Sequence, residues 1–487
     1  MKRPNILLVV LDATRADACS CYDCKWPVTP NLDDLAAEGV LFEQAISPAP
    51  WTLPAMASMF TGFFPSQLGV YEQRRLPNRF PTLSQILSEN GYATFGITSN
   101  SWLSADFGLQ RGFDTMHKQW QWLQTSQEIN KLALMEKSEN ESWMQTVIRE
   151  LSRGNPLKNL LNAAHARFLA FRRDLGASRV ISPLSHWVQE QAGPWFALVH
   201  YLEAHLPYRP PLEWVARFDQ DLAEARRWCE ADQLRAAWRH MARLERLSEA
   251  DLATWRSLYL AEVSYADYHL GNLVTWLRNT GRLDNTLVVV VADHGENLGD
   301  HGLLNHQYCV YDTLLRVPLV MHSPGSIPSG QRITHQVQTL DLFAAILEAA
   351  NVEKPPSASE SLLSDKKRPF VIAEYGVPNA PHPRNLERFG LREEQLSGFE
   401  RGFKALRTDT HKLILGTDGS VELYAWQDDP LEMDDLSSRH PEVVRDLRGK
   451  LEKWQQEHRP RQEEASRGGW EIDPETEARL RALGYIE

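Results

Sequence analysis

The sequence predicts an α/β protein with a mainly parallel, doubly wound sheet and a smaller C-terminal α+β domain with antiparallel strands. Continuous apolar runs, which are typical of strands buried on both faces, alternate with helical segments through the first 350 residues. Near the C-terminus, strand-like segments follow one another without helices between them. The chain has 487 residues, more than the ~250–300 that one hydrophobic core supports, so two domains are expected.

The N-terminal elements alternate between strand and helix. Residues 5–11 read NILLVVL and end at the carboxylate of Asp12. A helix is expected after Thr29, a candidate N-cap, because Pro30 suits the first helical position. A strand at 40–47 and a helix, glycine and strand within 82–100 continue the alternation.

The later elements repeat this pattern and then change it. A long amphipathic helix is expected over 248–281, where Ser248 and Asp251 form a capping-box-like pair. Apolar runs predict strands within 195–205, 285–297 and 316–323. Antiparallel strands are expected within 370–376, 403–415 and 421–426, and a helical tail from 440 onward.

These elements divide the chain into a large domain over 1–350 and a small antiparallel-sheet domain with a helical tail over 369–487. Two helical insertions are expected in the first domain, at about 117–190 and 213–247. They are either solvated helices that pack on the domain or a lid over its site, and the sequence leaves both readings open.

Composition excludes several classes of partner and location. The net charge of −12 argues against nucleic acid, whose phosphates need a basic surface. No segment approaches the ~20 apolar residues of a membrane span, and no signal peptide is recognised. Five cysteines, an odd number, suit a reducing compartment, so a cytoplasmic location is expected. The cluster CSCYDC lacks a second Cys/His group, which favours ordinary thiols over a metal site.

Three candidate metal ligands end two of the apolar runs. Asp12 follows the first predicted strand, and Asp293 and His294 follow the most apolar one. Because the carboxyl ends of parallel strands share one edge of a sheet, these side chains are expected to converge. Two carboxylates and an imidazole suit Mn²⁺, Zn²⁺ or Mg²⁺ better than Ca²⁺. Singly, an aspartate at a strand end is more often a turn former, but three such groups together favour a metal site.

Thr52, in the stretch PWTLPAMASMFTG, has two interpretations. As an N-cap it would accept a backbone N–H of the following helical turn. As a nucleophile it would sit at a helix N-terminus that favours anions, and it would need a neighbouring metal or base to become reactive. The predicted metal ligands favour the nucleophile.

Four ordered stretches carry a family resemblance: PNILLVVLDATRAD, APWTLPAMASMFTG, ADHGENLGDHGLLNHQ and KALRTDTHKLIL with ELYAWQDDPLE. Together they resemble the sulfatase family of the alkaline phosphatase superfamily over about residues 4–435. The resemblance implies an α/β/α sandwich, alkaline phosphatase-like, that hydrolyses sulfate or phosphate esters at a metal-bound hydroxyl nucleophile.

The resemblance also implies roles for individual residues. It places Asp12, Thr52, Asp293 and His294 on ligands of one divalent metal ion and makes Thr52 the nucleophile. His205 matches a histidine that contacts the tetrahedral anion of the substrate, and His306 falls where many members carry a basic residue. We expect His306 to protonate or stabilise the leaving oxygen.

Several positions depart from the family pattern. Sulfatases carry Cys or Ser at position 52, which is oxidised to formylglycine, within C/S-x-P-x-R; here the residues are Thr52 and, in place of the arginine, Met56. Oxidation of threonine would give a ketone instead of an aldehyde. Ala13 replaces the second aspartate of the usual pair, and ITSNSWLS (97–104) stands where Gly-Lys-Trp-His is common. The site has therefore lost ligands and positive charge.

These departures favour cleavage of a phosphodiester, phosphonate or related ester. A threonyl ester must be cleaved by attack on its central atom, a route that phosphorus tolerates. A site with fewer cations also suits an ester that carries a single negative charge. Two alternatives stay open: a sulfatase that acts without formylglycine, and a sulfatase-like protein that binds without catalysis. The expected partner is a small-molecule, glycan-linked or lipid-linked sulfate or phosphate ester. Homo-oligomers are possible, and the natural substrate cannot be read from the sequence.

Overall fold

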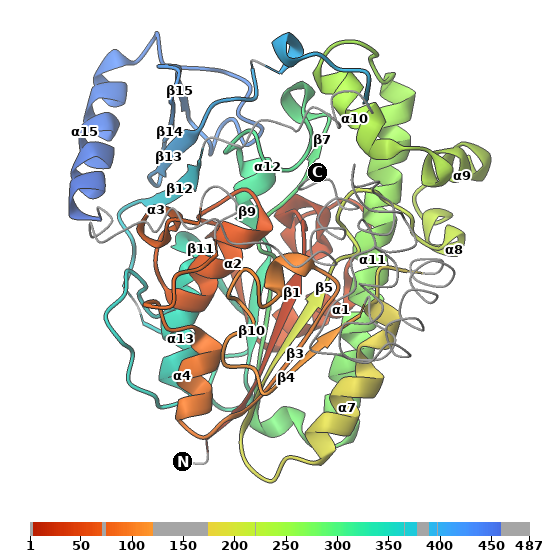
Figure 1. Ribbon diagram of the computed structural model, residues 1–487, viewed down its shortest axis with the longest axis vertical. Coiled ribbons are helices and arrows are strands. Elements are labelled where there is room, and N and C mark those ends of the chain that lie inside the picture. Colours follow the sequence, from red (N-terminus) through yellow and green to blue (C-terminus); the bar gives the residue numbers. More distant parts are fainter. Residues whose placement is uncertain are drawn as a thin grey trace, which may run out of the picture.

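A large sheet of nine strands forms the centre of the described part of the protein (Figure 1). The computed structural model describes residues 3–70, 75–119, 174–219, 221–364, 366–376, 389–396 and 398–458. The strands lie in the order β11-β2-β10-β6-β1-β5-β3-β4, with β9 paired to β2. Their bounds are β1 Asn5–Leu11, β2 Val40–Ile46, β3 Ala93–Thr98, β4 Thr115–Lys118, β5 Trp195–Tyr201, β6 Thr286–Val291, β9 Arg316–Val317, β10 Leu319–His322 and β11 Gln331–Gln338.

The centre of this sheet is parallel and apolar. β1 pairs in parallel with β5 on one side and with β6 on the other, while β10 runs antiparallel to β6 and β2. Every residue of β5 and β6 is buried, as the continuous apolar runs predicted. The mainly parallel sheet is therefore confirmed.

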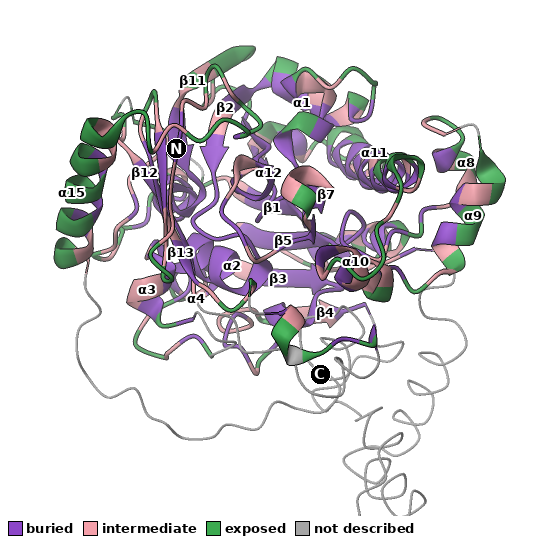
Figure 2. Cartoon of the chain, turned by 90° about the horizontal axis from the view of Figure 1, so that it is seen from above, coloured by how far each residue is buried: buried purple, intermediate pink, exposed green. Residues whose placement is uncertain are grey.

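Helices cover both faces of the sheet, which makes the predicted α/β/α sandwich. Figure 2 shows α1 (Pro30–Glu38) and α11 (Glu249–Asn279) on one side, with α2 (Thr52–Thr61) and α4 (Leu83–Glu89) on the other. α13 (Leu342–Ala349) contacts α2 and α4. α11 begins at the predicted capping box, in which the Asp251 N–H donates to Ser248 Oγ at 3.1 Å.

A second, four-stranded antiparallel sheet forms the C-terminal unit that the sequence predicts. Its strands are β12 (Val371–Tyr375), β13 (Phe403–Arg407), β14 (Lys412–Gly416) and β15 (Val421–Tyr424), paired in that order. Helix α15 (Pro441–Glu457) buries Leu447, Leu451 and Trp454 in the same apolar cluster as this sheet. Figure 1 shows this unit in blue beside the larger sheet.

The two predicted insertions differ in how much of them the structure describes. Residues 120–173, most of the first insertion, lie outside the described residues, and α7 (Ile181–Gln189) forms its C-terminal part. The second insertion contains α8 (Leu212–Val215), α9 (Leu222–Glu230) and α10 (Gln233–Met241). Trp228 and Trp238 from these helices share an apolar cluster with Trp255 of α11. They therefore pack on the domain; whether they also act as a lid stays a prediction.

The shorter described elements connect the main ones. They are α3 (Pro65–Leu68), α12 (Asp312–Leu315), and the two-stranded sheet of β7 (Asn297–Leu298) and β8 (Leu304–Asn305). No helix within the described ranges is long and apolar enough to cross a membrane. All five cysteines are free, as expected for ordinary thiols, and the compartment inferred from them stays a prediction.

Candidate active site

The carboxyl ends of β1 and β6 carry the three residues that the sequence singles out as metal ligands. Asp12 follows β1, and Asp293 and His294 follow the neighbouring β6. All three side chains are buried. His294 Nε2 lies 3.5 Å from Asp12 Oδ1 and 3.6 Å from Asp293 Oδ2. The sheet thus brings together residues that are far apart in the chain, and their role as ligands stays a prediction.

Gly295 allows the chain to pass close to its neighbours immediately after these residues. A Cβ atom at this position would lie 2.0 Å from the carbonyl oxygen of Thr313. A side chain would therefore displace the segment that carries Asp293 and His294.

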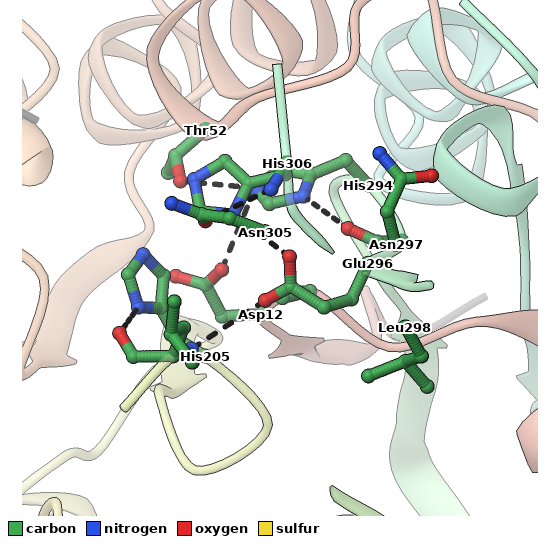
Figure 3. A network of polar contacts seen from close by, with 12 residues as sticks. Asp12, Thr52, His205, His294, Glu296, Asn297, Leu298, Asn305 and His306 are labelled. Atoms are coloured by element: carbon green, nitrogen blue, oxygen red, sulfur yellow. Dashed lines mark hydrogen bonds and ion pairs between the residues drawn. The ribbon is translucent and has the colours of Figure 1, made fainter. Parts of the chain in front are cut away.

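Thr52 is the first residue of α2, and its hydroxyl points to the same cluster (Figure 3). Thr52 Oγ1 lies 3.2 Å from His294 Nε2 and receives a hydrogen bond of 3.4 Å from Asn100 Nδ2. The N-cap of α2 is Trp51, in extended conformation, so the alternative interpretation of Thr52 as a helix cap is wrong. The side chain lies at the positive end of the helix dipole, where an anion is stabilised.

The donor atoms fit a divalent metal ion. Ligands about 2.1 Å from a shared ion stand about 3.0–3.5 Å apart, close to the separations between His294, Thr52 and the two carboxylates. Asp12 Oδ1 and Asp293 Oδ2 are buried and have no hydrogen-bond partner. Burial, followed by the neighbouring Asp293 carboxylate, raises the pKa of Asp12 well above its ordinary value. A bound cation would satisfy both oxygens and oppose that shift.

His205 and His306 stand beside this cluster, on the side away from the sheet core. The His306 ring centroid lies 4.5 Å from that of His294 and 4.7 Å from that of His205. Figure 3 shows both imidazoles around the space next to Thr52 and Asp12. Burial, with His294 and His205 nearby, lowers the pKa of His306 well below its ordinary value. An anionic ester bound here would favour the protonated form of His306.

Glu296 is the partner of His306 and was not singled out in the sequence. His306 Nδ1 lies 3.4 Å from Glu296 Oε1, and the Leu206 N–H donates to Glu296 Oε2 at 3.4 Å. Burial raises the pKa of Glu296 well above its ordinary value. The glutamate therefore orients His306 and ties the loop that carries His205 to the segment after β6.

Arg15 contacts the segment that follows β6 and carries Glu296. Its guanidinium donates to Asp300 Oδ2 at 2.7 Å and to the Glu296 carbonyl oxygen at 3.2 Å, and it forms a second ion pair with Asp17. Arg15 and Asp17 are thus structural partners.

Two further polar residues at the sheet edge escaped the sequence analysis. Asn100, after β3, donates to Asp12 Oδ2 at 2.7 Å. His200, at the end of β5, has its Nε2 3.6 Å from the same oxygen. Among the described residues, the group of His, Cys, Asp and Glu with ligand atoms within 4.8 Å of one another is Asp12, His200 and Asp293. The sequence signal for His200 is a single histidine in the apolar run of β5, one residue before the end of that strand.

Comparison with known proteins agrees with this fold. The family model described as Sulfatase matches residues 4–352. A relative from Escherichia coli, "Uncharacterized sulfatase YidJ", is 26% identical over 90% of this chain and 83% of its own length. The N-acetylglucosamine-6-O-sulfatase of Bacteroides thetaiotaomicron is 23% identical over 94% of this chain and 87% of its own.

Solved structures show the same architecture. The phosphonate monoester hydrolase of Agrobacterium radiobacter superposes with a TM-score of 0.70 at 21% identity, covering 94% of this chain and 96% of that one. A structure titled "BT4656 in complex with its substrate D-Glucosamine-2-N, 6-O-disulfate" has a TM-score of 0.68 at 18% identity, covering 94% and 98%. At such identities the likeness shows the fold.

Proposed function

The chain belongs to the sulfatase family, and we propose that it is a metal-dependent hydrolase that cleaves a phosphodiester, phosphonate or related ester through Thr52. The observation that carries this proposal is the contact of 3.2 Å between Thr52 Oγ1 and His294 Nε2, beside two buried aspartates. The hydroxyl of Thr52 lies at the position where the family resemblance places the nucleophile. It does not cap helix α2, whose N-cap is Trp51.

The proposed ligands of one divalent ion are Asp12, Thr52, Asp293 and His294. The mixture of oxygen donors and an imidazole nitrogen suits Mn²⁺, Zn²⁺ or Mg²⁺ better than Ca²⁺. When bound, the ion supplies positive charge that lowers the pKa of the hydroxyl and neutralises an anionic oxygen of the ester. Asn100 holds the Asp12 carboxylate in place through its hydrogen bond of 2.7 Å.

Catalysis by this chain then has two stages. Thr52 Oγ1 attacks the central phosphorus in line with the leaving oxygen, so that a threonyl ester forms as the original ester bond breaks. Water cleaves the threonyl ester in the second stage and restores the hydroxyl. Thr52 releases its proton to solvent as it attacks, and the leaving oxygen takes one from the protonated donor beside it. The water of the second stage returns a proton to Thr52 Oγ1, solvent reprotonates the donor, and water is the only co-reactant.

The two histidines beside the cluster have separate tasks. His306, whose Nδ1 faces Glu296 at 3.4 Å, donates the proton that the leaving oxygen needs. His205 binds a nonbridging oxygen of the substrate, from the loop that follows β5. Their ring centroids lie 4.7 Å apart, which is close enough for both to contact one tetrahedral group.

Two features favour a phosphorus ester over a sulfate ester. Threonine cannot become the aldehyde from which sulfatases expel sulfate, because its Cβ carries a methyl group. Met56, at the position of the family arginine, is fully buried in α2 and supplies no charge. A site with less positive charge suits the single charge of a diester or phosphonate ester. The substrate is a small-molecule, glycan-linked or lipid-linked ester.

Hydrolysis of a sulfate ester without formylglycine is the second candidate function. The relatives named as sulfatases favour it, since one of them acts by name on N-acetylglucosamine-6-O-sulfate. The purified protein should first be analysed for metal and then offered an aryl sulfate, a bis-aryl phosphate and an aryl phosphonate ester. Faster turnover of the phosphorus esters supports the first candidate, and faster turnover of the sulfate supports the second. Metal binding with no turnover on any ester would indicate a binding protein.

The variant Thr52→Ala tests the nucleophile. We expect turnover to fall by at least about 10³-fold, as for loss of other nucleophiles, while the folded structure and metal content are kept. Thr52→Ser, which retains a hydroxyl, should keep measurable activity. Thr61→Ala is the matched control, because Thr61 ends the same helix and its hydroxyl donates to the Ala57 carbonyl at 2.7 Å, away from the cluster. Wild-type turnover by Thr52→Ala would reject the assignment.

A further inference from the structure

We propose that His200 is an additional ligand of the metal ion, binding through Nε2 next to Asp12 and Asp293. The inference rests on the metal site proposed above and extends it by one residue. Ala13, the neighbour of Asp12, brings only a methyl group to this edge, and its N–H donates to Asp293 Oδ1 at 3.3 Å. The imidazole of His200 supplies a donor that position 13 lacks.

The strand register places His200 under the carboxylates. Val10 of β1 pairs with His200 of β5 and with Val291 of β6, so the three residues form one row across the sheet. Side chains alternate between the two faces of a strand, so residues two apart share a face. Asp12 and Asp293 lie two residues beyond Val10 and Val291. His200 therefore faces the same side of the sheet as both aspartates, one row before them.

The distances agree with this register. His200 Nε2 lies 3.6 Å from Asp12 Oδ2, and one ligand atom each of His200, Asp12 and Asp293 lie within 4.8 Å of one another. A separation of 3.6 Å is long for a hydrogen bond but close to the ~3.0–3.5 Å expected between two ligands of one ion. His294 approaches Asp12 Oδ1 at 3.5 Å and Asp293 Oδ2 at 3.6 Å, so the two imidazoles approach the Asp12 carboxylate through different oxygens.

The buried imidazole of His200 also lacks the polar partners that a metal ion would replace. The side chain is 0% exposed, and neither ring nitrogen has a hydrogen-bond partner. Burying an imidazole without partners is costly, and such groups are rare in folded proteins. Coordination would satisfy Nε2 without any change in the strand.

A second imidazole changes the metal that the site prefers. Two imidazole nitrogens, two carboxylates and one hydroxyl form a mixed nitrogen and oxygen set that suits Mn²⁺ or Zn²⁺. Ca²⁺ and Mg²⁺ prefer oxygen ligands. His200 is thus a residue that sets metal selectivity in this chain.

The test counts the coordinated nitrogens in the full-length protein loaded with Mn²⁺. Pulsed electron paramagnetic resonance detects the coupling of each directly bound imidazole nitrogen to the ion. We expect two such couplings in the wild type and one in each of His200→Gln and His294→Gln. The affinity of His200→Gln for Mn²⁺, measured by titration, should fall by at least about tenfold, the smaller of the losses seen when metal-site residues are replaced.

His322→Asn is the matched control. His322 is also buried in the sheet, on β10, and its Nδ1 has no hydrogen-bond partner. It pairs in register with Val288, toward the start of β6 and away from the carboxyl edge. Its replacement should leave both nitrogen couplings and the affinity for Mn²⁺ unchanged.

The possible outcomes separate this inference from the proposed function. A single coupling in the wild type that persists in His200→Gln would overturn the role of His200 and leave the site of Asp12, Thr52, Asp293 and His294 standing. Two couplings that persist in His200→Gln would also overturn it. A wild-type protein that binds no Mn²⁺, Zn²⁺ or Mg²⁺ would overturn both proposals together.

Discussion

The charged cluster at the junction of the two sheets contains its own cations, whereas the cluster at the carboxyl edge of the large sheet is predominantly acidic. At the junction, Lys412 of β14 is fully buried and forms ion pairs of 2.6 Å with both Asp312 and Glu432. At the edge, Asp12 and Asp293 each keep a buried carboxylate oxygen without a hydrogen-bond partner. Buried charges are stable when they are paired, so the edge cluster has the composition of a site that receives its cation from outside.

Arg407 completes the junction cluster and joins the two domains. Its Nε lies 3.2 Å from Asp312 Oδ2, and its Nη2 donates to Gln44 of β2 at 2.7 Å. The guanidinium lies 3.5 Å from the ring centroid of Trp426, within range of a cation–π contact. The neighbouring cations lower the pKa of Asp312 to about 2. At this cluster the acids are neutralised by cations of the chain itself, and these contacts attach the small sheet to the large one.

Removing the cation from the junction should give the largest change in stability. Lys412→Met leaves Asp312 and Glu432 buried with one partner fewer, and the free energy of unfolding should fall by about 3–5 kcal/mol. Urea unfolding followed by circular dichroism measures this change. A loss below about 1 kcal/mol would show that the junction does not depend on the pairing.

The control for this variant lies on helix α15 of the same C-terminal unit. Lys450 there is 45% exposed and stands 2.9 Å from Asp446, which is 63% exposed. Because solvent screens this pair, Lys450→Met should lower the free energy of unfolding by no more than about 1 kcal/mol.

The contrast between the two clusters also marks what the sequence could predict. Apolar periodicity and stop signals were sufficient for the main strands and for α11, because these patterns are local. The edge residues Asp12, Asp293 and His294 could be placed together because parallel strands end at a common edge. The burial of Arg407 could not be predicted, since its sequence neighbourhood gives no sign of its ion-pair partner Asp312, which is distant in the chain.

The same limit explains the site residues that were missed. His200 and Asn100 reach the cluster only through the pairing of β5 and β3 with their neighbours, and the order of strands in a sheet is not a local property. The cap interpretation of Thr52 fails by one residue of helix register, since Trp51 is the N-cap of α2, and sequence patterns do not resolve such a shift.

A buried acid outside both clusters sharpens the comparison. Glu203, in the loop after β5, accepts from the Ala177 N–H at 2.7 Å through Oε1, but its Oε2 has no hydrogen-bond partner. Burial, followed by the charge of Asp174, raises the pKa of Glu203 to about 8. Here the acid is kept neutral by its proton, in place of a lysine or a metal ion.

The pH dependence of stability tests this third mode of neutralisation. Between the ordinary pKa of a glutamate and about 8, the unfolded chain ionises while the native state keeps the proton, so stability falls as pH rises. Glu203→Gln keeps an oxygen that can accept from the Ala177 N–H. Because glutamine does not ionise, the variant does not lose this part of its stability as pH rises. Relative to the wild type it should gain up to about 1 kcal/mol per pH unit between about pH 5 and 8. Urea unfolding at four pH values measures the trend, and a constant difference would contradict it.

The smallest expected effect concerns the edge cluster itself. In protein freed of metal by chelation, Asp12→Asn removes one of two adjacent buried carboxylates and keeps an oxygen that can accept from Asn100. The variant should therefore be more stable than the wild type at neutral pH, by roughly 1 kcal/mol, the equivalent of about one pKa unit. Thermal unfolding of the two metal-free proteins compares them directly.

Added metal should reverse this order. With Mn²⁺ at about 100 times its dissociation constant, the wild type gains about 2.7 kcal/mol through binding to the native state, whereas Asp12→Asn has lost a ligand and gains less. The wild type then unfolds at the higher temperature, which is the expected behaviour of a cluster that receives its cation from solution. At the junction, where Lys412 is part of the chain, the same addition should leave the cost of Lys412→Met unchanged. If Asp12→Asn is destabilised with and without metal alike, the carboxylate is a structural group like Asp312, and the distinction between the two clusters fails.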